Sequence, residues 1–249
     1  MQEVMTQPET LQGYRLSPQQ ERLWRVQQST RGMVFRALCA ISIEGVLDVT
    51  TLRSALRRVV QRHEICRTSF QRRPEFKFPI QIISEWADPF WQTIDIEDSN
   101  DQESRIDEVF RAEREQPIDL DQPSLLRATL LTLSSERNIL IVSLPSLCAD
   151  TRTLQNLIKE VAESYEACLR GEESEAEVTQ YVEFSEWLGE LLDSDEGQAG
   201  KDFWTALASF AQPALPLESK SAPDAEFVPD VFSFEITAET TEPDVLLAC

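Results

Sequence analysis

Hydrophobic and polar positions follow regular patterns over several stretches of the chain, and these patterns predict its elements. Arg36 to Val46 carries alternating and β-branched apolar residues, which predicts a strand. Asp48 then offers an N-cap, and it is followed at helical spacing by Leu52, Leu56, Val59 and Val60. We therefore expect a strand that leads into an amphipathic helix.

Two short strands and a surface helix are predicted next. The strand candidates are Ile65 to Phe70 and Pro79 to Ile83, with a basic, proline-containing turn at residues 72–74 between them. Ser99 to Glu115 is highly charged, but one of its sides carries Ile106, Val109 and Phe110. This one-sided pattern predicts a helix that lies on the surface.

The longest apolar stretch predicts a β-hairpin followed by a helix. Leu125 to Leu133 and Ile139 to Leu144 are apolar runs separated by a polar segment that contains Ser134 to Arg137, and the second run reads as a strand buried on both faces. The helix begins near Asp150 and Thr151 and ends before Gly171, with one apolar stripe formed by Leu154, Leu157, Ile158, Val161, Tyr165 and Cys168. Residues 145–150 should therefore form a loop between a buried strand and a helix.

The last third of the chain is acidic and then rich in proline. Glu172 to Glu196 holds ten acidic residues and no Lys or Arg, interleaved with apolar residues at helical spacing. This pattern fits a solvated face on a core-packed helix, or a docking surface for a basic partner. A further helix is predicted over Lys201 to Phe210, an extended linker over 212–230, and the first strand of a second unit over Val231 to Ile236.

Composition narrows the classes of partner and compartment. The formal charge of −21 disfavours nucleic acid and anionic membrane, because both bind basic surfaces. The five cysteines are far apart and form no C-x-x-C pair, so neither a disulfide framework nor a zinc site is expected, and a reduced, cytoplasmic location is the simplest hypothesis. No secretory signal is visible, and the longest apolar run has about half of the roughly 20 residues that span a bilayer.

Four local patterns occur in a fixed order along the chain. Ser17 to Trp24 resembles S-x-A-Q-x-R-L-W, with Gln19 in place of Ala, and Arg62 to Phe70 matches R-H-E-x-L-R-T-x-F, with Cys66 in place of Leu. Residues 118–128 resemble F-D-L…P-L-L-R-A, with Ile118 in place of Phe. Residues 181–187 resemble Y-x-D-F-A-x-W, and Phe203-Trp204 matches the Y-W that follows.

Together these patterns resemble the condensation domains of nonribosomal peptide synthetases. The resemblance covers about residues 14 to 236. It implies an α/β, chloramphenicol-acetyltransferase-like lobe, a mixed sheet flanked by helices, with the start of a second, similar lobe at the C-terminus. The implied division is a tail at 1–13, the N-terminal lobe at 14–211, the linker at 212–230 and a truncated second lobe at 231–249. It also implies carrier domains with phosphopantetheine arms as partners, and no directly bound cofactor.

The reaction centre of that family departs from its pattern here. Where the family carries H-H-x-x-x-D-G, this sequence has Pro145-Ser146-Leu147-Cys148-Ala149-Asp150-Thr151. Both histidines and the glycine are replaced, so Pro145, Ser146 and Thr151 are degenerate positions and only Asp150 remains. The second family histidine is credited with general-base or positioning work near neutral pH, and the hydroxyl of Ser146 is too weak a base to replace it.

No other residue offers an obvious replacement. His63 is the only histidine, and it lies in a motif with a structural role in the family. Cys148 has no histidine partner nearby in sequence, and Ser146 lacks the G-x-S-x-G elbow, so neither is expected to be a nucleophile. In the family the motif Asp forms an ion pair with the second Arg of R-H-E-x-L-R-T, and the resemblance therefore implies a pair between Asp150 and Arg67, which predicts a preserved fold with a dismantled reaction centre.

Three functional hypotheses follow. The first is a non-catalytic interaction module that docks a carrier domain, an adjacent synthetase domain or a trans-acting tailoring oxygenase or hydroxylase, with Glu183, Glu186 and Glu190 as the candidate partner face. The second is an unusual condensation enzyme that acts by positioning once its second lobe is present, because holding two reactants together can lower a barrier by roughly 7–11 kcal/mol. The third is a fragment with a structural role. No phosphate-binding loop or metal-ligand cluster is present in the sequence.

Overall fold

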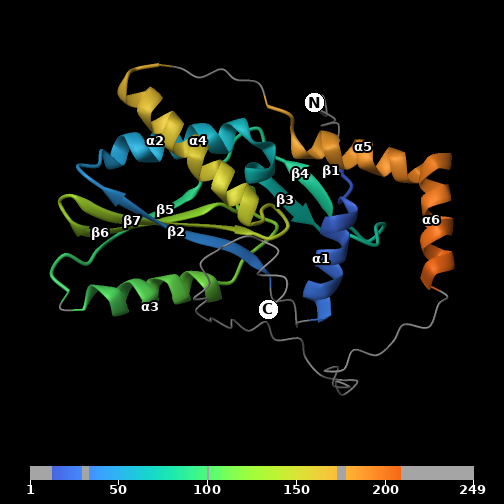
Figure 1. The fold of residues 1–249 in the computed structure, drawn as a ribbon, viewed down its shortest axis with the longest axis horizontal. Coiled ribbons are helices and arrows are strands. Elements are labelled where there is room, and N and C mark those ends of the chain that lie inside the picture. Colours follow the sequence, from blue (N-terminus) through green and yellow to red (C-terminus); the bar gives the residue numbers. More distant parts are fainter. Residues whose placement is uncertain (1–12, 30–33, 100, 173–177, 209–249) are drawn as a thin grey trace, which may run out of the picture.

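The computed structural model describes residues 13–29, 34–99, 101–172 and 178–208, and these contain two β-sheets (Figure 1). The larger sheet has the strand order β2-β7-β6-β5, and its strands are β2 (Arg36–Glu44), β5 (Phe90–Asp95), β6 (Arg127–Ser134) and β7 (Arg137–Pro145). The smaller has the order β1-β4-β3, and its strands are β1 (Gly13–Tyr14), β3 (Thr68–Gln71) and β4 (Ile80–Ile83).

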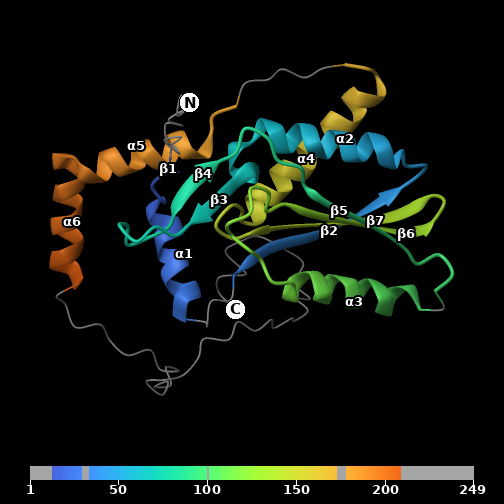
Figure 2. The same cartoon turned by 180° about the vertical axis from the view of Figure 1, so that it is seen from behind.

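Helices cover both faces of the larger sheet. Figures 1 and 2 show α2 (Val49–Arg62) and α4 (Thr151–Leu169) on one face and α3 (Gln102–Glu115) on the other. The main core lies beneath α2 and α4, and a smaller core around Leu131 and Ile141 lies beneath α3. The predicted fold class, an α/β mixed sheet flanked by helices, is confirmed.

The strand-to-helix unit forms where the polar pattern predicts it. Asp48 caps α2, because its carboxylate accepts the backbone N–H of Thr51 at 3.0 Å. All four apolar residues predicted for this helix are buried, and each such side chain stabilises the fold by about 1.5–3 kcal/mol relative to exposure. The period of 3.6 residues thus fixes which face of α2 meets the sheet.

The predicted β-hairpin is also present, but a parallel strand beside it was not predicted. β6 and β7 pair antiparallel, with Leu130 opposite Leu140, and β7 is buried along most of its length. β5 pairs parallel with β6, and α3 makes the connection between them. Because β5 lies at the edge of the sheet and is largely exposed, it lacks the apolar alternation that predicts a strand.

Other boundaries differ from the prediction. Residues Glu64–Arg67 form a 3₁₀ turn, and the strand begins only at Thr68, whose hydroxyl donates to the Glu64 carbonyl at 2.7 Å. The last described helices are α5 (Tyr181–Asp193) and α6 (Asp195–Ala208), so α6 begins six residues before the predicted start. The predicted linker at 212–230 and the strand at 231–236 lie outside the described residues.

A buried ionic cluster fastens α3 to the sheet. The Glu113 carboxylate of α3 accepts from Arg36 of β2 at 3.0 Å, from Arg127 of β6 at 2.8 Å and from the Ser143 hydroxyl of β7 at 2.6 Å. The side chains of Arg36 and Glu113 are only 3% and 7% exposed. Burial lowers the pKa of Arg36, and the Glu113 charge opposes that effect. Each buried charge therefore depends on the other for compensation.

We expect Glu113→Ala to lower the free energy of unfolding by about 3–5 kcal/mol, because it leaves the buried Arg36 guanidinium without its counter-charge. Urea unfolding followed by circular dichroism measures the change. Glu115→Ala, on the exposed end of the same helix, is the matched control and should change stability by less than about 0.5 kcal/mol. Equal losses in the two variants would show that the cluster does not fasten the helix.

Candidate functional site

The loop that carries the degenerate motif is a tight turn between β7 and α4. The Pro145 carbonyl accepts the N–H groups of Cys148 at 2.8 Å and Ala149 at 3.1 Å. The Ser146 N–H donates to the Phe35 carbonyl at 2.7 Å, which ties the turn to the segment before β2. Pro145 is buried, Ser146 is half-buried, and Asp150 and Thr151 are exposed where α4 begins. The backbone of the turn is therefore held at both ends.

No base in the part of the chain that the structure describes is hydrogen-bonded to the Ser146 hydroxyl. Among the described residues, no hydrogen bond of its hydroxyl is found, and the sequence has serine where the family resemblance places a histidine. The only histidine, His63, ends α2, and its Nε2 lies 2.7 Å from the Glu160 carboxylate of α4. This contact joins two helices and supports the structural interpretation of His63. Nothing in this geometry raises the nucleophilicity of Ser146.

Cys148 is a buried thiol and not a reactive one. Only 8% of the residue is exposed. Burial raises the pKa of its thiol well above the ordinary value, and the nearby Cys66 raises it further. The pKa of Cys66, which is fully enclosed in the same core, is raised to about 12, again mainly by burial. Because the thiolate is the nucleophile, Cys148 remains unreactive near neutral pH.

The predicted ion pair between Arg67 and Asp150 is wrong. The Arg67 guanidinium lies 3.5 Å from the Glu64 carboxylate and also donates to the Ser84 carbonyl. Asp150 instead caps α4, accepting the N–H of Thr153 at 2.7 Å and its hydroxyl at 2.8 Å. These bonds lower the pKa of Asp150. Arg67 is thus bonded to Glu64 and to the Ser84 carbonyl, and Asp150 is bonded to Thr153, so the two side chains do not pair with each other.

A buried polar network, which the sequence patterns did not predict, is hydrogen-bonded to the turn at residues 145–151. The side chain of Gln20, on α1 (Pro18–Ser29), donates to the Leu147 carbonyl of the turn and to Gln81 Oε1 of β4, both at 3.0 Å. Gln81 in turn donates to the Arg15 carbonyl at 2.8 Å. Gln20 and Gln81 are 3% and 1% exposed. The network therefore joins the degenerate turn to the first helix and to the smaller sheet.

The same network extends to α5. It also contains a capping pattern that is visible in the sequence and that the sequence analysis did not use. The hydroxyls of Ser17 and Tyr181 lie 2.7 Å apart. Ser17 and Gln20 also cap the helix reciprocally, because the Ser17 N–H donates to Gln20 Oε1 at 2.9 Å and the Gln20 N–H to Ser17 Oγ at 3.2 Å. A Ser-Pro-x-Gln sequence with this capping pattern signals a helix start, and that signal could have placed both residues.

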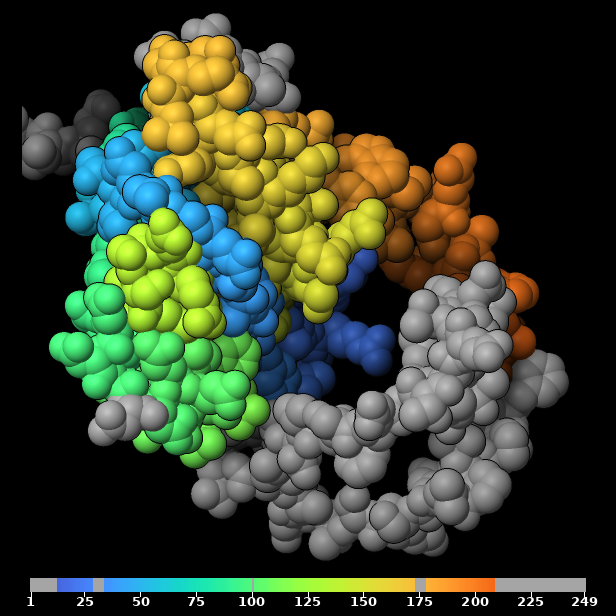
Figure 3. Space-filling model, turned by 60° about the vertical axis from the view of Figure 1, so that its left-hand side comes forward, coloured from blue at the N-terminus to red at the C-terminus, as the bar shows by residue number. Residues whose placement is uncertain are grey.

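The three acidic residues predicted as a partner face are exposed along α5, but they are not equivalent. Glu183 closes a capping box with Gln180 at the start of the helix, so part of its role is structural. Glu186 and Glu190 lie on the same side of the helix, beside the exposed aromatic rings of Phe184 and Trp187, whose centroids are 5.8 Å apart. Figure 3 shows the orange surface of α5 and α6 to one side of α4.

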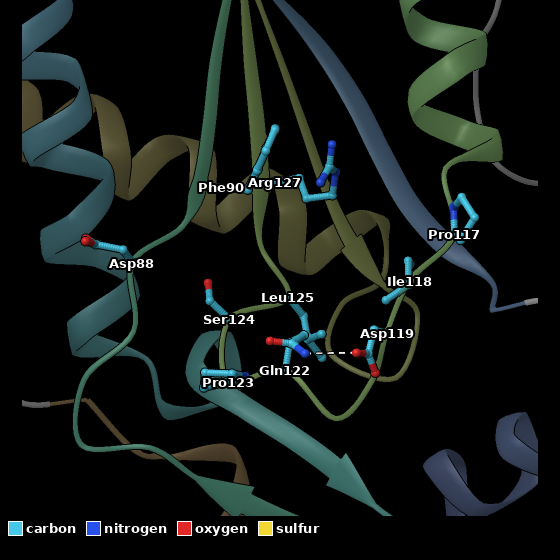
Figure 4. A pocket seen from close by; sticks show the side chains of 10 residues that line it. All are labelled: Asp88, Phe90, Pro117, Ile118, Asp119, Gln122, Pro123, Ser124, Leu125 and Arg127. Carbon is cyan, nitrogen blue, oxygen red and sulfur yellow. Dashed lines mark hydrogen bonds between the residues drawn. The ribbon is translucent and has the colours of Figure 1, made fainter.

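A cavity of about 480 Å³ lies elsewhere, at the start of β5 and β6 (Figure 4). Its lining includes Phe90, with the Arg127 guanidinium 3.9 Å from the ring centroid. Its carboxylates already have partners, since Asp119 accepts from Gln122 at 2.9 Å and Asp88 pairs with Arg57 at 2.7 Å. No residue of the degenerate motif lines this cavity. Its two carboxylates are therefore not free bases, and the Ser124 hydroxyl in its lining has no base hydrogen-bonded to it.

The part of the chain that the structure describes contains neither a candidate metal-ligand cluster nor a candidate membrane-spanning helix. No three His, Cys, Asp or Glu side chains there are grouped to hold a metal ion. Within the same residues, no helix combines the length and apolar character needed to cross a bilayer.

Comparisons with known proteins agree with the motifs. The family model for the condensation domain matches residues 10–247. Surfactin synthase subunit 2 of Bacillus subtilis is 29% identical over 233 residues, which are 92% of this chain and 6% of the synthase. Tyrocidine synthase 2 of Brevibacillus parabrevis is 31% identical over 199 residues, or 80% of this chain and 5% of the synthase.

Solved structures show the same fold. The starter condensation domain of rhizomide synthetase, in a complex with C8-CoA, superposes with a TM-score of 0.74 at 23% identity over 85% of this chain and 49% of its own. The first condensation domain of the calcium-dependent antibiotic synthetase gives a TM-score of 0.70 at 22% identity over 82% of this chain. The present chain thus spans about half the length of these domains.

Thiol labelling tests the buried state of Cys148. We expect iodoacetamide at pH 8 to leave Cys66 and Cys148 unmodified in the native chain, because burial keeps both thiols protonated and shielded, and to modify the half-buried Cys168 faster than either of them. Peptide mass spectrometry identifies the modified residue, and labelling in 8 M urea is the positive control. Rapid native labelling of Cys148 would contradict this account and would reopen covalent chemistry.

Gln20→Leu tests the network beneath the turn. It removes the partners of the Leu147 carbonyl and of buried Gln81, and an unsatisfied buried polar group costs about 1–3 kcal/mol, so we expect a loss of about 2–4 kcal/mol. Urea unfolding measures it. Gln19→Leu, at the exposed neighbouring position, is the control and should have little effect. If both variants unfold at the wild-type urea concentration, the network does not support the turn.

Proposed function

The chain belongs to the condensation-domain family of nonribosomal peptide synthetases, and from this premise we propose that it is a degenerate member that acts as an interaction module. Members of the family work with phosphopantetheine-bearing carrier domains and with adjacent synthetase domains. The partner we propose for this module is a carrier domain or a trans-acting tailoring enzyme, an oxygenase or hydroxylase. Its proposed location is the cytoplasm, and no directly bound cofactor is part of the proposal.

One observation carries the proposal: the turn at 145–151 keeps its fold but lacks a base. Peptide-bond formation requires a proton to leave the attacking amine, and a histidine suits that transfer because its pKa lies near neutrality. Here Ser146 stands at that position, the only histidine is bonded to Glu160 between two helices, and Cys148 stays protonated in the core. The buried bonds from Gln20 and to Phe35 maintain the turn all the same.

The alternative is a condensation enzyme that works by positioning. Preorganisation of a thioester and a good nucleophile can lower the barrier by roughly 7–11 kcal/mol without a base. That function would need the second lobe, since this chain spans about half the length of solved condensation domains. We favour the interaction module because the positions that contact the amine in the family have been replaced together, whereas the scaffold around them has not.

The partner face we propose is the acidic side of α5. Glu186 and Glu190 are exposed and flank Phe184 and Trp187, which are 43% and 55% exposed. Aromatic rings bordered by charges of one sign are typical of protein interfaces, and the sign here suits a basic partner. Glu183 belongs to the same face, but its capping bond gives it a second role.

Charge reversal tests this face. We expect Glu186→Lys/Glu190→Lys to weaken binding of the tailoring oxygenase or hydroxylase at least tenfold, because two attractive charges become repulsive, with the affinity measured by biolayer interferometry on the complete polypeptide. Glu103→Lys/Asp107→Lys on α3 changes the net charge equally and should leave the affinity within twofold. Glu183 is left intact to preserve the cap. Unchanged binding in the α5 variant would refute the assignment.

A further inference from the structure

The cavity at the start of β5 and β6 contains a hydroxyl without a partner. Ser124 lines this cavity, and its Oγ is buried, yet it forms no hydrogen bond with any residue that the structure describes. A buried polar group without a partner is costly, so each one in a native structure needs an explanation. Figure 4 shows this hydroxyl pointing toward the strand ends that carry Phe90 and Arg127. The cavity therefore offers a donor that the chain itself does not use.

The ionic cluster beside the cavity has more positive than negative charge. Arg36 and Arg127 both donate to the same oxygen of Glu113, at 3.0 and 2.8 Å. One carboxylate thus serves two guanidinium groups, and one positive charge has no counter-charge within the cluster. The Nε of Arg36 is also buried without a hydrogen-bond partner among the described residues. Burial lowers the pKa of Arg36, Glu113 opposes this effect, and the like charge of Arg127 adds to it.

Arg127 is the member of the cluster that lines the cavity. Its guanidinium lies 3.9 Å from the centre of the Phe90 ring, which is also part of the lining. Its Nε is bonded to Glu113, whereas no hydrogen bond of its two terminal nitrogens is found among the described residues. The side chain is 22% exposed, so a small molecule can approach it. A guanidinium with free terminal nitrogens suits a carboxylate, because its planar fork can donate two parallel bonds.

The two acids of the lining already have partners. Both oxygens of Asp88 accept from Arg57, at 2.7 and 3.3 Å. Asp119 accepts from the side chain of Gln122 and from the backbone N–H of Asp121, and these bonds lower its pKa. Asp119 is also exposed, so water and salt screen its charge. The charge that lacks a partner at this cavity is therefore positive.

The remaining walls of the cavity are mostly apolar. Pro117, Ile118, Pro123 and Leu125 join Phe90 in the lining. The volume of about 480 Å³ lies within the range of roughly 300–1,000 Å³ that is typical of small-molecule sites. Such sites combine apolar walls with a few polar groups that orient the ligand. Here the polar groups are a guanidinium and a hydroxyl.

We propose that this cavity binds a small organic carboxylate with an apolar body. Arg127 and the Ser124 hydroxyl hold the carboxylate, and the body packs against Phe90. The bound anion supplies the negative charge that the cluster lacks, and it gives the buried hydroxyl a partner. No residue of the degenerate motif lines the cavity, so this inference goes beyond the proposed function and does not depend on it.

The test uses benzoate as the probe and titrates it into the ¹⁵N-labelled chain while amide chemical shifts are recorded. We expect saturable shifts at the amides of Phe90, Ser124 and Leu125. Benzamide lacks the charge, benzylamine reverses it, and acetate lacks the ring, so all three should bind more weakly than benzoate. Benzoate should also raise the melting temperature more than benzamide at the same concentration, because a ligand that binds only the folded state stabilises it.

Ser124→Ala separates a ligand site from a structural role. The hydroxyl has no partner among the described residues, so its removal should leave the melting temperature unchanged or raise it. The same change should weaken benzoate binding about tenfold, because a hydrogen bond to a charged group is lost. Arg127→Lys keeps the charge but not the planar fork, and it should weaken binding severalfold. Ser135→Ala and Arg137→Lys, at exposed positions of the β6–β7 hairpin, are the matched controls and should leave affinity within twofold.

Each of the following results would overturn the proposal. The first is the absence of saturable shifts at the lining amides. The second is binding of benzylamine or acetate as tight as that of benzoate, because the carboxylate or the apolar body would then not be recognised. The third is equal benzoate affinity in Ser124→Ala and the wild type. Circular dichroism checks that each variant is folded.

Discussion

The buried amide of Gln20 is the interaction on which the arrangement around the degenerate turn depends. Its side chain joins the first helix, the smaller sheet and the turn after β7, three segments separated by more than 60 residues in sequence. A buried amide left without partners costs more than the bonds contribute when formed, so the network tolerates little displacement of any member. This network holds the backbone of the turn at 145–151, where the proposed function places a lost reaction centre.

The elements that sequence predicts well are those with a strong period. α2 and the β6–β7 hairpin bury complete faces, so apolar spacing fixes them. β5 is different, because it lies at the edge of the sheet and its pairing with β6 follows from a crossover through α3 that no local pattern encodes. The predicted strand begins at Ile65 because Ile65 and Cys66 are apolar, whereas Glu64–Arg67 form a 3₁₀ turn, which the hydrogen bond from the Thr68 hydroxyl to the Glu64 carbonyl stabilises.

The structure tests part of what the sequence predicts at the candidate site. The replacement of the family's two histidines stays a prediction from the motif resemblance, whereas Cys148 is buried, as the apolar run around it indicates. The ion pair predicted between Arg67 and Asp150 is not formed. The presence of an Arg and an Asp in the sequence does not show that their side chains are close, and the Asp150 carboxylate instead caps its helix by accepting the N–H of Thr153. The apolar pattern does not predict that Gln20 is buried, because it follows apolar residues only. The capping box of Ser17 and Gln20 does predict the start of the helix.

The account treats this chain as a scaffold whose reaction centre has lost its base and whose acidic face serves binding. Its central claim is best tested in the complete polypeptide, supplied with loaded donor and acceptor carrier domains and analysed by intact-protein mass spectrometry for transfer of the acyl group to the acceptor amine. The account predicts no transfer above the background without enzyme, with Ser146→Ala indistinguishable from the wild type. Transfer well above background would contradict it, and its loss in Ser146→Ala would show that the serine takes part in the reaction.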